Sequence, residues 1–354
     1  MTDAFVQEMM EWHFDPHTGS PFWLERAWTL GFDPRRDITS YADLRLFPNV
    51  TDELRDVPTE TLVPKGFGDR PDIAGVIESG GTTGAPKRLP MLREFADRLA
   101  AREAEVLTTA GVSKTAGWLS LFPGGPHGAL DQMRRAAQAY GDGILVFAVD
   151  LDPRWVKKQA TEGKTAVVDA YTDHIIDQAA FVLESQRIEM LRITPPVLAR
   201  LVRRDDLVEL VRDKVRHIIW GGAHMDADSR YFYRTELFPN TQIIGRYGTT
   251  MALGAGGSER PGLDHDDPCV FDPIIAPYVT FSVVDADSGE PVPYGERGQV
   301  VVHHLSKSFL LPNNAERDTA VRIQPGNGDQ IGDSVADIEP LREFTGARVV
   351  EGVY

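Results

Sequence analysis

Apolar and polar positions along most of the chain repeat with two periods, one typical of strands and one of helices. Short apolar runs predict strands at 72–77, 117–122, 143–149, 165–170, 217–220 and 242–245. Between these runs the apolar residues recur at helical spacing, which predicts helices at 92–110, 130–140, 155–162 and 175–187. Strands that alternate with helices predict βαβ units and parallel sheets.

The two ends of the chain follow other patterns. The first 70 residues carry Trp12, Trp23 and Trp28 and are broken by Pro and Gly, which predicts helical pieces joined by irregular chain. After about residue 268, turn residues separate apolar runs at 278–285, 298–304 and 319–323, which predicts an antiparallel, barrel-like piece. We therefore expect an α/β protein with three regions: a helical segment 1–70, α/β subdomains 71–267 and a β-rich subdomain 268–354.

Charge and cysteine content narrow the classes of partner. The 354 residues include 37 Lys plus Arg and 53 Asp plus Glu, a formal net charge of −16, which disfavours nucleic acids and anionic membranes. Cys269 is the one cysteine, so no internal disulfide or multi-cysteine metal site is possible. The N-terminus does not resemble a signal peptide, and no apolar run approaches the length of a membrane span. We expect a soluble, cytoplasmic protein that binds small molecules.

The segment from Ser79 to Lys87, SGGTTGAPK, has the composition of a phosphate-binding loop. It lies between an expected strand and an expected helix, and its glycines allow the backbone to approach a ligand closely. The other contributors are three hydroxyls and one cation: Ser79, Thr82, Thr83 and Lys87. Pro86 before the lysine and Arg88 after it exclude the Walker A pattern. The pattern G-x-G-x-x-G is not present here either, so a Rossmann dinucleotide site is not supported.

This loop resembles the signature of the adenylate-forming superfamily, which includes acyl-CoA ligases, adenylation domains and luciferases. That signature reads Ser/Thr-Ser/Gly-Gly-Thr-Thr-Gly-x-Pro-Lys, and 79–87 matches it almost completely. The resemblance covers about 70–354 and is greatest to the phenylacetate–CoA ligase branch and its relatives in natural-product pathways. It implies the large N-terminal domain of the adenylate-forming fold, with ATP as a substrate and AMP as a product.

Further motifs follow in the order that the resemblance implies. Gly221-Gly222-Ala223 resembles the turn along the adenine, and 246–251 (RYGTTM) resembles the family motif Tyr-Gly-x-Thr-Glu. A Gly-Asp pair near the end resembles the ribose-binding aspartate, with Asp333 preferred over Asp329. The resemblance thus implies nucleotide contacts from Ser79, Gly80, Gly81, Thr82, Thr83, Gly84, Lys87, Gly222, Ala223, Tyr247, Gly248, Thr249, Thr250 and Asp333. It gives catalytic roles to Lys87, Thr250 and His127, and an acyl pocket to Phe122, Trp220, His224 and Met251.

Two departures from the family pattern affect the expected chemistry. Met251 stands where the family has a glutamate that helps to hold Mg²⁺, and a thioether cannot ligate this hard cation. Mg²⁺ would then be held by the phosphates, by water or by another acid such as Glu78, so we expect no dedicated protein metal site. The acidic run 264–267 (DHDD) is either a metal site or a solvated loop. The second departure is the family's C-terminal lid domain with its catalytic lysine, which we expect to be absent after a segment at 344–348 that resembles the one before the hinge.

The resemblance implies that the protein activates a small acid as an acyl-adenylate. Aromatic residues in the expected acyl pocket favour an aryl acid, and transfer to CoA or another thiol is a further step that the family allows. Two alternatives stay open: activation of nitrite for the diazotisation of an arylamine, and a non-catalytic nucleotide-binding subunit. A protein partner or a homo-oligomer is compatible with each of these readings.

Overall fold

The computed structural model describes residues 2–81, 85–262, 269–326, 328, 330–341, 343–344 and 347–348. The chain divides into two compact units that are each discontinuous in sequence. Unit 1 contains Met1–Leu99, Thr249–Gly256 and Asp272–Leu341, and unit 2 contains Ala100–Gly248, Gly257–Phe271 and Arg342–Tyr354. Each unit therefore brings together segments that are distant in the sequence.

The N-terminal part of unit 1 is helical, as the sequence predicts for this stretch. Its helices are α1 (Thr2–Phe14), α2 (Pro21–Arg26) and α3 (Pro34–Asp37), followed by single helical turns η1 (Ala27–Thr29), η2 (Tyr41–Leu46), η3 (Glu53–Arg55), η4 (Thr59–Leu62) and η5 (Lys65–Phe67). An aromatic cluster holds these pieces together, because Trp23 packs against Phe47 with ring centroids 5.6 Å apart, and Phe47 stacks on Phe14 at 6.0 Å. The Trp23 indole Nε1 also donates a hydrogen bond to the Leu310 carbonyl at 2.9 Å.

The C-terminal part of unit 1 is antiparallel, as predicted. The strands β10 (Val279–Val284), β11 (Arg297–Ser306), β12 (Phe309–Ile323) and β13 (Ser334–Pro340) are adjacent in that order. His303 and His304 are adjacent on β11, so their side chains point to opposite faces. Both are buried, His304 against the Phe95 ring at 4.5 Å, and His303 beside Ser282.

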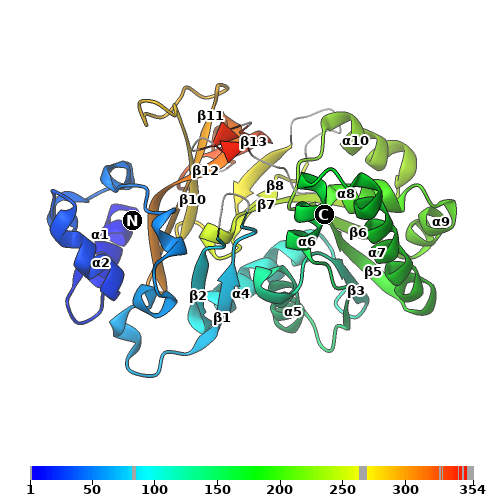
Figure 1. Cartoon of the computed structure of the whole chain (residues 1–354), viewed down its shortest axis with the longest axis horizontal. Coiled ribbons are helices and arrows are strands. Elements are labelled where there is room, and N and C mark those ends of the chain that lie inside the picture. The colour runs from blue at the N-terminus through cyan, green and yellow to red at the C-terminus, as the bar shows by residue number, and fades with distance from the viewer. Residues whose placement is uncertain are drawn as a thin grey trace. The chain divides into compact units, whose positions relative to one another are not determined.

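Unit 2 contains the parallel sheet that the βαβ pattern predicts. Its strands run in the order β4 (Val146–Ala148), β3 (Gly117–Leu121), β5 (Ile188–Ile193), β6 (His217–Gly221), β7 (Gln242–Gly248), and every neighbouring pair is parallel. Helices α5 (Ala129–Tyr140), α6 (Pro153–Thr161), α7 (Thr165–Ser185), α8 (Pro195–Leu201), α9 (Asp205–Lys214) and α10 (Ala227–Phe232) connect the strands; η6 (Gly125–His127) and η7 (Tyr233–Leu237) are single turns (Figure 1). The α/β fold class predicted from the sequence is confirmed.

One face of the parallel sheet carries a compact apolar core. The core combines residues of α4 (Arg93–Thr109) and α5 with strand residues, and its members are Leu107, Val112, Trp118, Met133, Ala136, Ala137, Tyr140, Met190 and Ile219. Strand pairing explains the arrangement, since Trp118 pairs with Met190, and paired residues of neighbouring strands point to the same face. Four short strands complete the described elements: β8 (Gly256–Glu259), β9 (Val270–Pro273), β14 (Glu343–Phe344) and β15 (Ala347–Arg348).

One predicted strand is wrong, and some strands were not predicted. Residues 165–170 begin helix α7 and do not form a strand, because the buried residues Ile175, Ile176 and Ala179 continue a single helix in which Val167 is partly exposed. A strand at Ile188–Ile193 (β5) was not predicted. Strand β2 (Arg88–Leu92) was also missed. It pairs antiparallel with β1 (Ile73–Glu78), so the loop at 79–87 connects the two strands of a hairpin and does not connect a strand to a helix.

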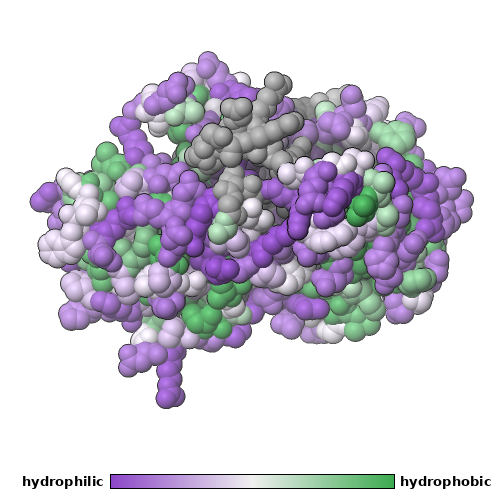
Figure 2. Space-filling view, viewed as in Figure 1, coloured by the Kyte–Doolittle hydropathy of each residue, from purple (hydrophilic) through white to green (hydrophobic). Residues whose placement is uncertain are grey.

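The visible surface is mostly hydrophilic, with hydrophobic residues in small separate groups (Figure 2). The large exposed apolar side chains are few, and include Trp28 (91% exposed), Leu145 and Phe181. Within the described residues, no helix combines the length and the apolar character needed to cross a bilayer.

Candidate active site

The expected phosphate loop is closed at its base by the β1–β2 hairpin. The Ser79 N–H donates to the Lys87 carbonyl at 3.0 Å, and the Lys87 N–H donates to the Ser79 hydroxyl at 2.9 Å. Gly81 has a φ of 65°, a conformation that favours glycine. Thr82, Thr83 and Gly84 lie outside the described residues. The hairpin therefore fixes the two ends of the loop, and with them the start of the Lys87 side chain.

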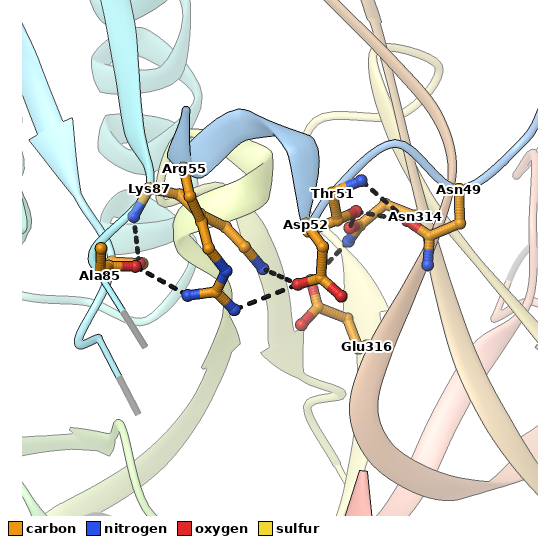
Figure 3. Close-up of polar contacts among 9 residues, drawn as sticks. Asn49, Thr51, Asp52, Arg55, Ala85, Lys87, Asn314 and Glu316 are labelled. Atoms are coloured by element: carbon orange, nitrogen blue, oxygen red, sulfur yellow. Dashed lines mark hydrogen bonds and ion pairs between the residues drawn. The ribbon is translucent and has the colours of Figure 1, made fainter. Parts of the chain in front are cut away.

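Lys87 lies in a polar cluster of unit 1. Its Nζ is 3.5 Å from Asp52 Oδ1, and its side chain is 13% exposed. Arg55 donates to the same Asp52 oxygen at 3.1 Å and to the Ala85 carbonyl of the loop at 2.7 Å. Figure 3 shows Lys87 and Arg55 converging on Asp52, with Glu316 close by. Two cations and the loop thus meet at one carboxylate.

The charged groups of this cluster shift one another's pKa values. Burial lowers the pKa of Lys87, and the Arg55 charge lowers it further, while Asp52 opposes both. Burial acts to raise the pKa of Asp52, but the Arg55 hydrogen bond and the Lys87 charge hold it below its usual range. Asp52 therefore stays ionised and neutralises only part of the two positive charges.

A second carboxylate, Glu316 on β12, reaches the same region. Its Oε1 accepts hydrogen bonds from the Thr249 hydroxyl and from Asn314 Nδ2, both at 2.7 Å. Thr51 and Asn49 extend this network, since the Thr51 hydroxyl is within hydrogen-bond distance of the Oδ1 atoms of Asn314 and Asn49 and can donate to either (Figure 3). Burial raises the pKa of Glu316, and hydrogen bonds from Thr249 and Asn314 and the Arg317 and Lys87 charges act against it. The expected nucleotide contact Thr249 is thus held by Glu316.

Asp52, Arg55 and Glu316 did not emerge from the sequence. Asp52 and Arg55 lie in an ordinary helical turn, and nothing local marks them. Glu316 shares one face of β12 with Asn314, because alternate residues of a strand point the same way. Polar residues at alternate positions inside a long strand were the sequence signal that could have pointed to Glu316.

The motif at 246–251 leads from β7 into the turn η8 (Thr250–Ala252). Thr250 is half-buried, and Met251 is buried with its N–H donating to the Thr249 hydroxyl at 3.2 Å. A buried thioether offers no hard oxygen ligand at this position. Among the described residues, no group of three or more His, Cys, Asp and Glu side chains is arranged to hold a metal ion. The acidic run 264–267 lies outside them.

In unit 2, the other expected motifs lie at the carboxyl ends of parallel strands. Gly221 at the end of β6 pairs with Arg246 on β7, and Gly222 has a φ of 79°. A side chain at Gly222 would come within 3.4 Å of the Phe122 ring, so the structure brings the adenine turn and one expected pocket residue together. Ligands of α/β proteins bind at this edge of the sheet.

The remaining expected residues of unit 2 differ in exposure. Trp220 is buried and packs on Phe271 at 6.2 Å, while the half-buried Tyr247 lies 6.3 Å from the same ring. His127 is half-buried in η6, and His224 is exposed, as is Gly222. Their predicted roles stay predictions.

Asp333 is engaged within unit 1. Its Oδ1 lies 2.9 Å from Arg322 Nε, and its Oδ2 accepts a hydrogen bond from the Val283 N–H at 3.1 Å. Burial raises the pKa of Asp333, and the Arg322 charge opposes this. These contacts tie β13 to β10, so ribose binding by Asp333 stays a prediction. Asp329 lies outside the described residues.

The middle of the chain matches a known family. A family model described as AMP-binding enzyme matches residues 160–306, which include β5 to β7, the motif at 246–251 and β11. This match supports the resemblance to the adenylate-forming superfamily.

Individual relatives agree on the fold. A crystal structure of 2-hydroxyisobutyryl-CoA ligase in the postadenylation state with 2-HIB-AMP is similar with a TM-score of 0.64 at 16% identity, covering 96% of this chain and 67% of that one. ATP-bound MatB from Rhodopseudomonas palustris is similar with a TM-score of 0.53 at 19% identity, over 77% of this chain and 49% of that one. In sequence, 4-coumarate–CoA ligase-like 6 from Oryza sativa subsp. japonica is 27% identical over 177 residues, 49% of this chain. The match spans 28% of the rice protein's length.

Proposed function

We propose that this protein uses ATP to convert a small, aryl carboxylic acid into its acyl-adenylate. The observation that carries the proposal is the placement of Lys87 and Arg55 at the base of the loop, both on Asp52. A nucleotide triphosphate would supply the further negative charge that these two cations and the loop N–H groups attract. The match of residues 160–306 to AMP-binding enzymes and the similar structures solved with ATP and with 2-HIB-AMP support the same ligand.

In the proposed reaction, a carboxylate oxygen of the acid attacks the α-phosphorus of ATP. A new O–P bond forms, the bond from the α-phosphorus to the bridging oxygen breaks, and pyrophosphate leaves with the electron pair. No covalent enzyme group takes part, so the protein contributes positioning and stabilisation of charge. Lys87, Arg55 and the loop residues Ser79 to Gly84 would hold the departing pyrophosphate.

The resemblance gives roles to the other predicted residues of each unit. Thr250 would contact a phosphate, and Gly222, Ala223, Tyr247, Gly248, Thr249 and Asp333 would hold the nucleoside. Phe122, Trp220, His224 and Met251 would bound the acid, with His127 orienting it. Mg²⁺ would neutralise phosphate charge, and Glu316 and Asp52 are the hard oxygen donors of the described residues beside Lys87. The acyl group would then be transferred to CoA or another thiol. We place this reaction in a natural-product pathway and the protein in the phenylacetate–CoA ligase-like branch.

ATP–pyrophosphate exchange across a panel of aryl acids tests the proposal, with nucleotide affinity measured by calorimetry. We expect exchange with at least one aryl acid. We also expect Lys87→Ala to weaken ATP binding by about 10- to 100-fold, since hydrogen bonds to charged groups contribute about 1.5–3 kcal/mol. Lys65→Ala is the control, because the Lys65 Nζ donates to the Pro16 carbonyl at 3.4 Å and is not part of the Lys87 cluster.

Three results would overturn this function. Unchanged ATP affinity in Lys87→Ala would remove the phosphate-loop assignment. Diazo product from nitrite plus an aminoaryl acid, without acid-dependent exchange, would replace acid activation by nitrite activation. ATP binding with no AMP formation under any condition would indicate a non-catalytic nucleotide-binding protein.

A further inference from the structure

Two arginines project from the carboxyl edge of the parallel sheet in unit 2. Arg192 on β5 pairs with Ile219 on β6, and Ile219 pairs with Ile244 on β7. Arg246 lies two residues beyond Ile244, so it points to the same face as Arg192. The β6 residue level with Arg246 is Gly221, which places no side chain between the two strands that carry the guanidinium groups.

The two arginines lie just beyond the apolar core. Met190 and Ile219 belong to the core, and Arg192 follows Met190 on the same face after one residue. Glu103 lies one helical turn before the core residue Leu107 on α4, and it faces the same region. The Glu103 Oε2 atom is 3.1 Å from Arg246 Nη2. The Glu103 side chain is 24% exposed and the Arg246 side chain is 10% exposed. The polar group therefore closes the core at the edge where ligands of α/β proteins bind.

The hydrogen-bonding capacity of these arginines is not filled by the described residues. Arg192 Nε and Arg246 Nη1 are buried and have no acceptor there. Arg192 Nη1 donates a long hydrogen bond of 3.5 Å to the Ala129 carbonyl, and Arg246 Nη2 donates to Glu103. Burial lowers the pKa of Arg192, the Glu103 charge acts against this, and the Arg246 charge adds to it. Two guanidinium groups thus share one carboxylate, an arrangement that is costly without a further anion.

The chemistry of the site favours a carboxylate as that anion. Two guanidinium groups and Glu103 leave one net positive charge, which a single carboxylate neutralises and a doubly charged phosphate would exceed. Planar guanidinium groups match a carboxylate with two parallel hydrogen bonds. The Arg192 guanidinium also lies 5.1 Å from the centre of the Phe122 ring, so an aromatic wall adjoins the charged group.

We infer that Arg192 and Arg246 bind a second carboxylate of the acid substrate, one that is not activated, so that the preferred substrates are aryl dicarboxylic acids. This inference rests on the proposed function, because it assigns a substrate class to the same enzyme. The reacting carboxylate is a poor occupant, since two guanidinium groups would stabilise its charge and reduce its nucleophilicity. Glu103 competes with the incoming carboxylate for Arg246.

Calorimetry with matched acids tests the inference. The probes are the three benzenedicarboxylates, the corresponding carbamoylbenzoates and benzoate, each titrated into the full chain. We expect at least one dicarboxylate to bind about 10- to 100-fold more tightly than its carbamoyl analogue, which keeps the shape and loses the charge. Arg246→Gln should abolish this preference, Arg246→Lys should retain part of it, and Glu103→Gln should increase it.

Arg187→Gln is the control, because Arg187 immediately precedes β5, is exposed and pairs with Glu189. It should leave the preference unchanged, and thermal unfolding should show that every variant is folded. If Arg246→Gln does not fold, the affinity of Glu103→Gln for dicarboxylates tests the inference. If Glu103 and Arg246 formed only a structural ion pair, Glu103→Gln would not gain affinity for dicarboxylates. Equal binding of dicarboxylates and their carbamoyl analogues by the wild-type chain, or no binding of either, overturns the inference.

Pyrophosphate exchange separates this inference from the proposed function. Exchange with monocarboxylic acids and no dicarboxylate preference would refute the subsite and leave acid activation standing. A dicarboxylate preference that depends on Arg246, without any ATP binding, would refute acid activation and leave the subsite standing.

Discussion

Replacing Asp52 with asparagine is expected to tighten ATP binding, because Asp52 is the anion that now shares Lys87 and Arg55. Its Oδ1 lies 3.5 Å from Lys87 Nζ and 3.1 Å from Arg55 Nη2. In the proposed function the nucleotide phosphates need the same two cations. Removing the carboxylate takes away one competing anion and raises the local charge by one unit.

The magnitude follows from the exposure of Asp52. Two unit charges 3.5 Å apart attract by about 5 kcal/mol at an effective dielectric constant of about 20. The Asp52 side chain is 58% exposed, however, and exposed ion pairs contribute only about 0.2–1 kcal/mol. We therefore expect ATP to bind about 1.4- to 5-fold more tightly to Asp52→Asn, with the gain shrinking at high salt.

The assay is calorimetric titration of ATP at low and at moderate ionic strength. Asp56→Asn is the matched control, since Asp56 is exposed, lies in the same segment and changes the net charge equally. Equal gains in both variants would show a general charge effect and refute the specific role of Asp52. Weaker binding in Asp52→Asn would show that Asp52 positions Lys87 productively, which also contradicts the reasoning.

Two further predictions concern stability. Burial lowers the pKa of His13 and His303 to about 4 and of His304 to about 3, below the unfolded value near 6.5. Their contribution to stability is therefore fully present above about pH 6.5 and is lost as the pH falls toward 4, by about 1.4 kcal/mol per pH unit for each histidine. Urea unfolding at pH 7, 6 and 5 measures this, and His303→Gln should reduce the slope; a flat profile would contradict it. Gly222→Ala should cost about 1–2 kcal/mol, because φ is 79° there. Gly163→Ala, with a φ of 72° and open space around it, is the comparison. A Cβ at Gly222 would lie at the ordinary contact distance of 3.4 Å from the Phe122 ring, so we expect similar losses at both positions, and no loss at either would contradict the reasoning.

Local patterns predicted much of the fold correctly, and their failures have physical causes. The helix at 92–110 and the strand at 217–220 follow from apolar spacing, and the structure has α4 and β6 there. Residues 165–170 are rich in β-branched residues, but burial of Ile175, Ile176 and Ala179 extends one helix through them. Propensity within six residues is too small to oppose the packing of a 21-residue helix.

By itself, the sequence determined the chemistry of the loop from Ser79 to Lys87, because glycines, hydroxyls and a lysine in consecutive positions are a local property. It also determined the α/β alternation, since the spacing of apolar residues is a local property of each segment. Only the tertiary structure decided which charges surround that chemistry. Glu316 reaches the Lys87 region from a distant strand, and Glu103 meets Arg246 across 143 positions. Such pairs depend on strand order and register, so no local pattern specifies them.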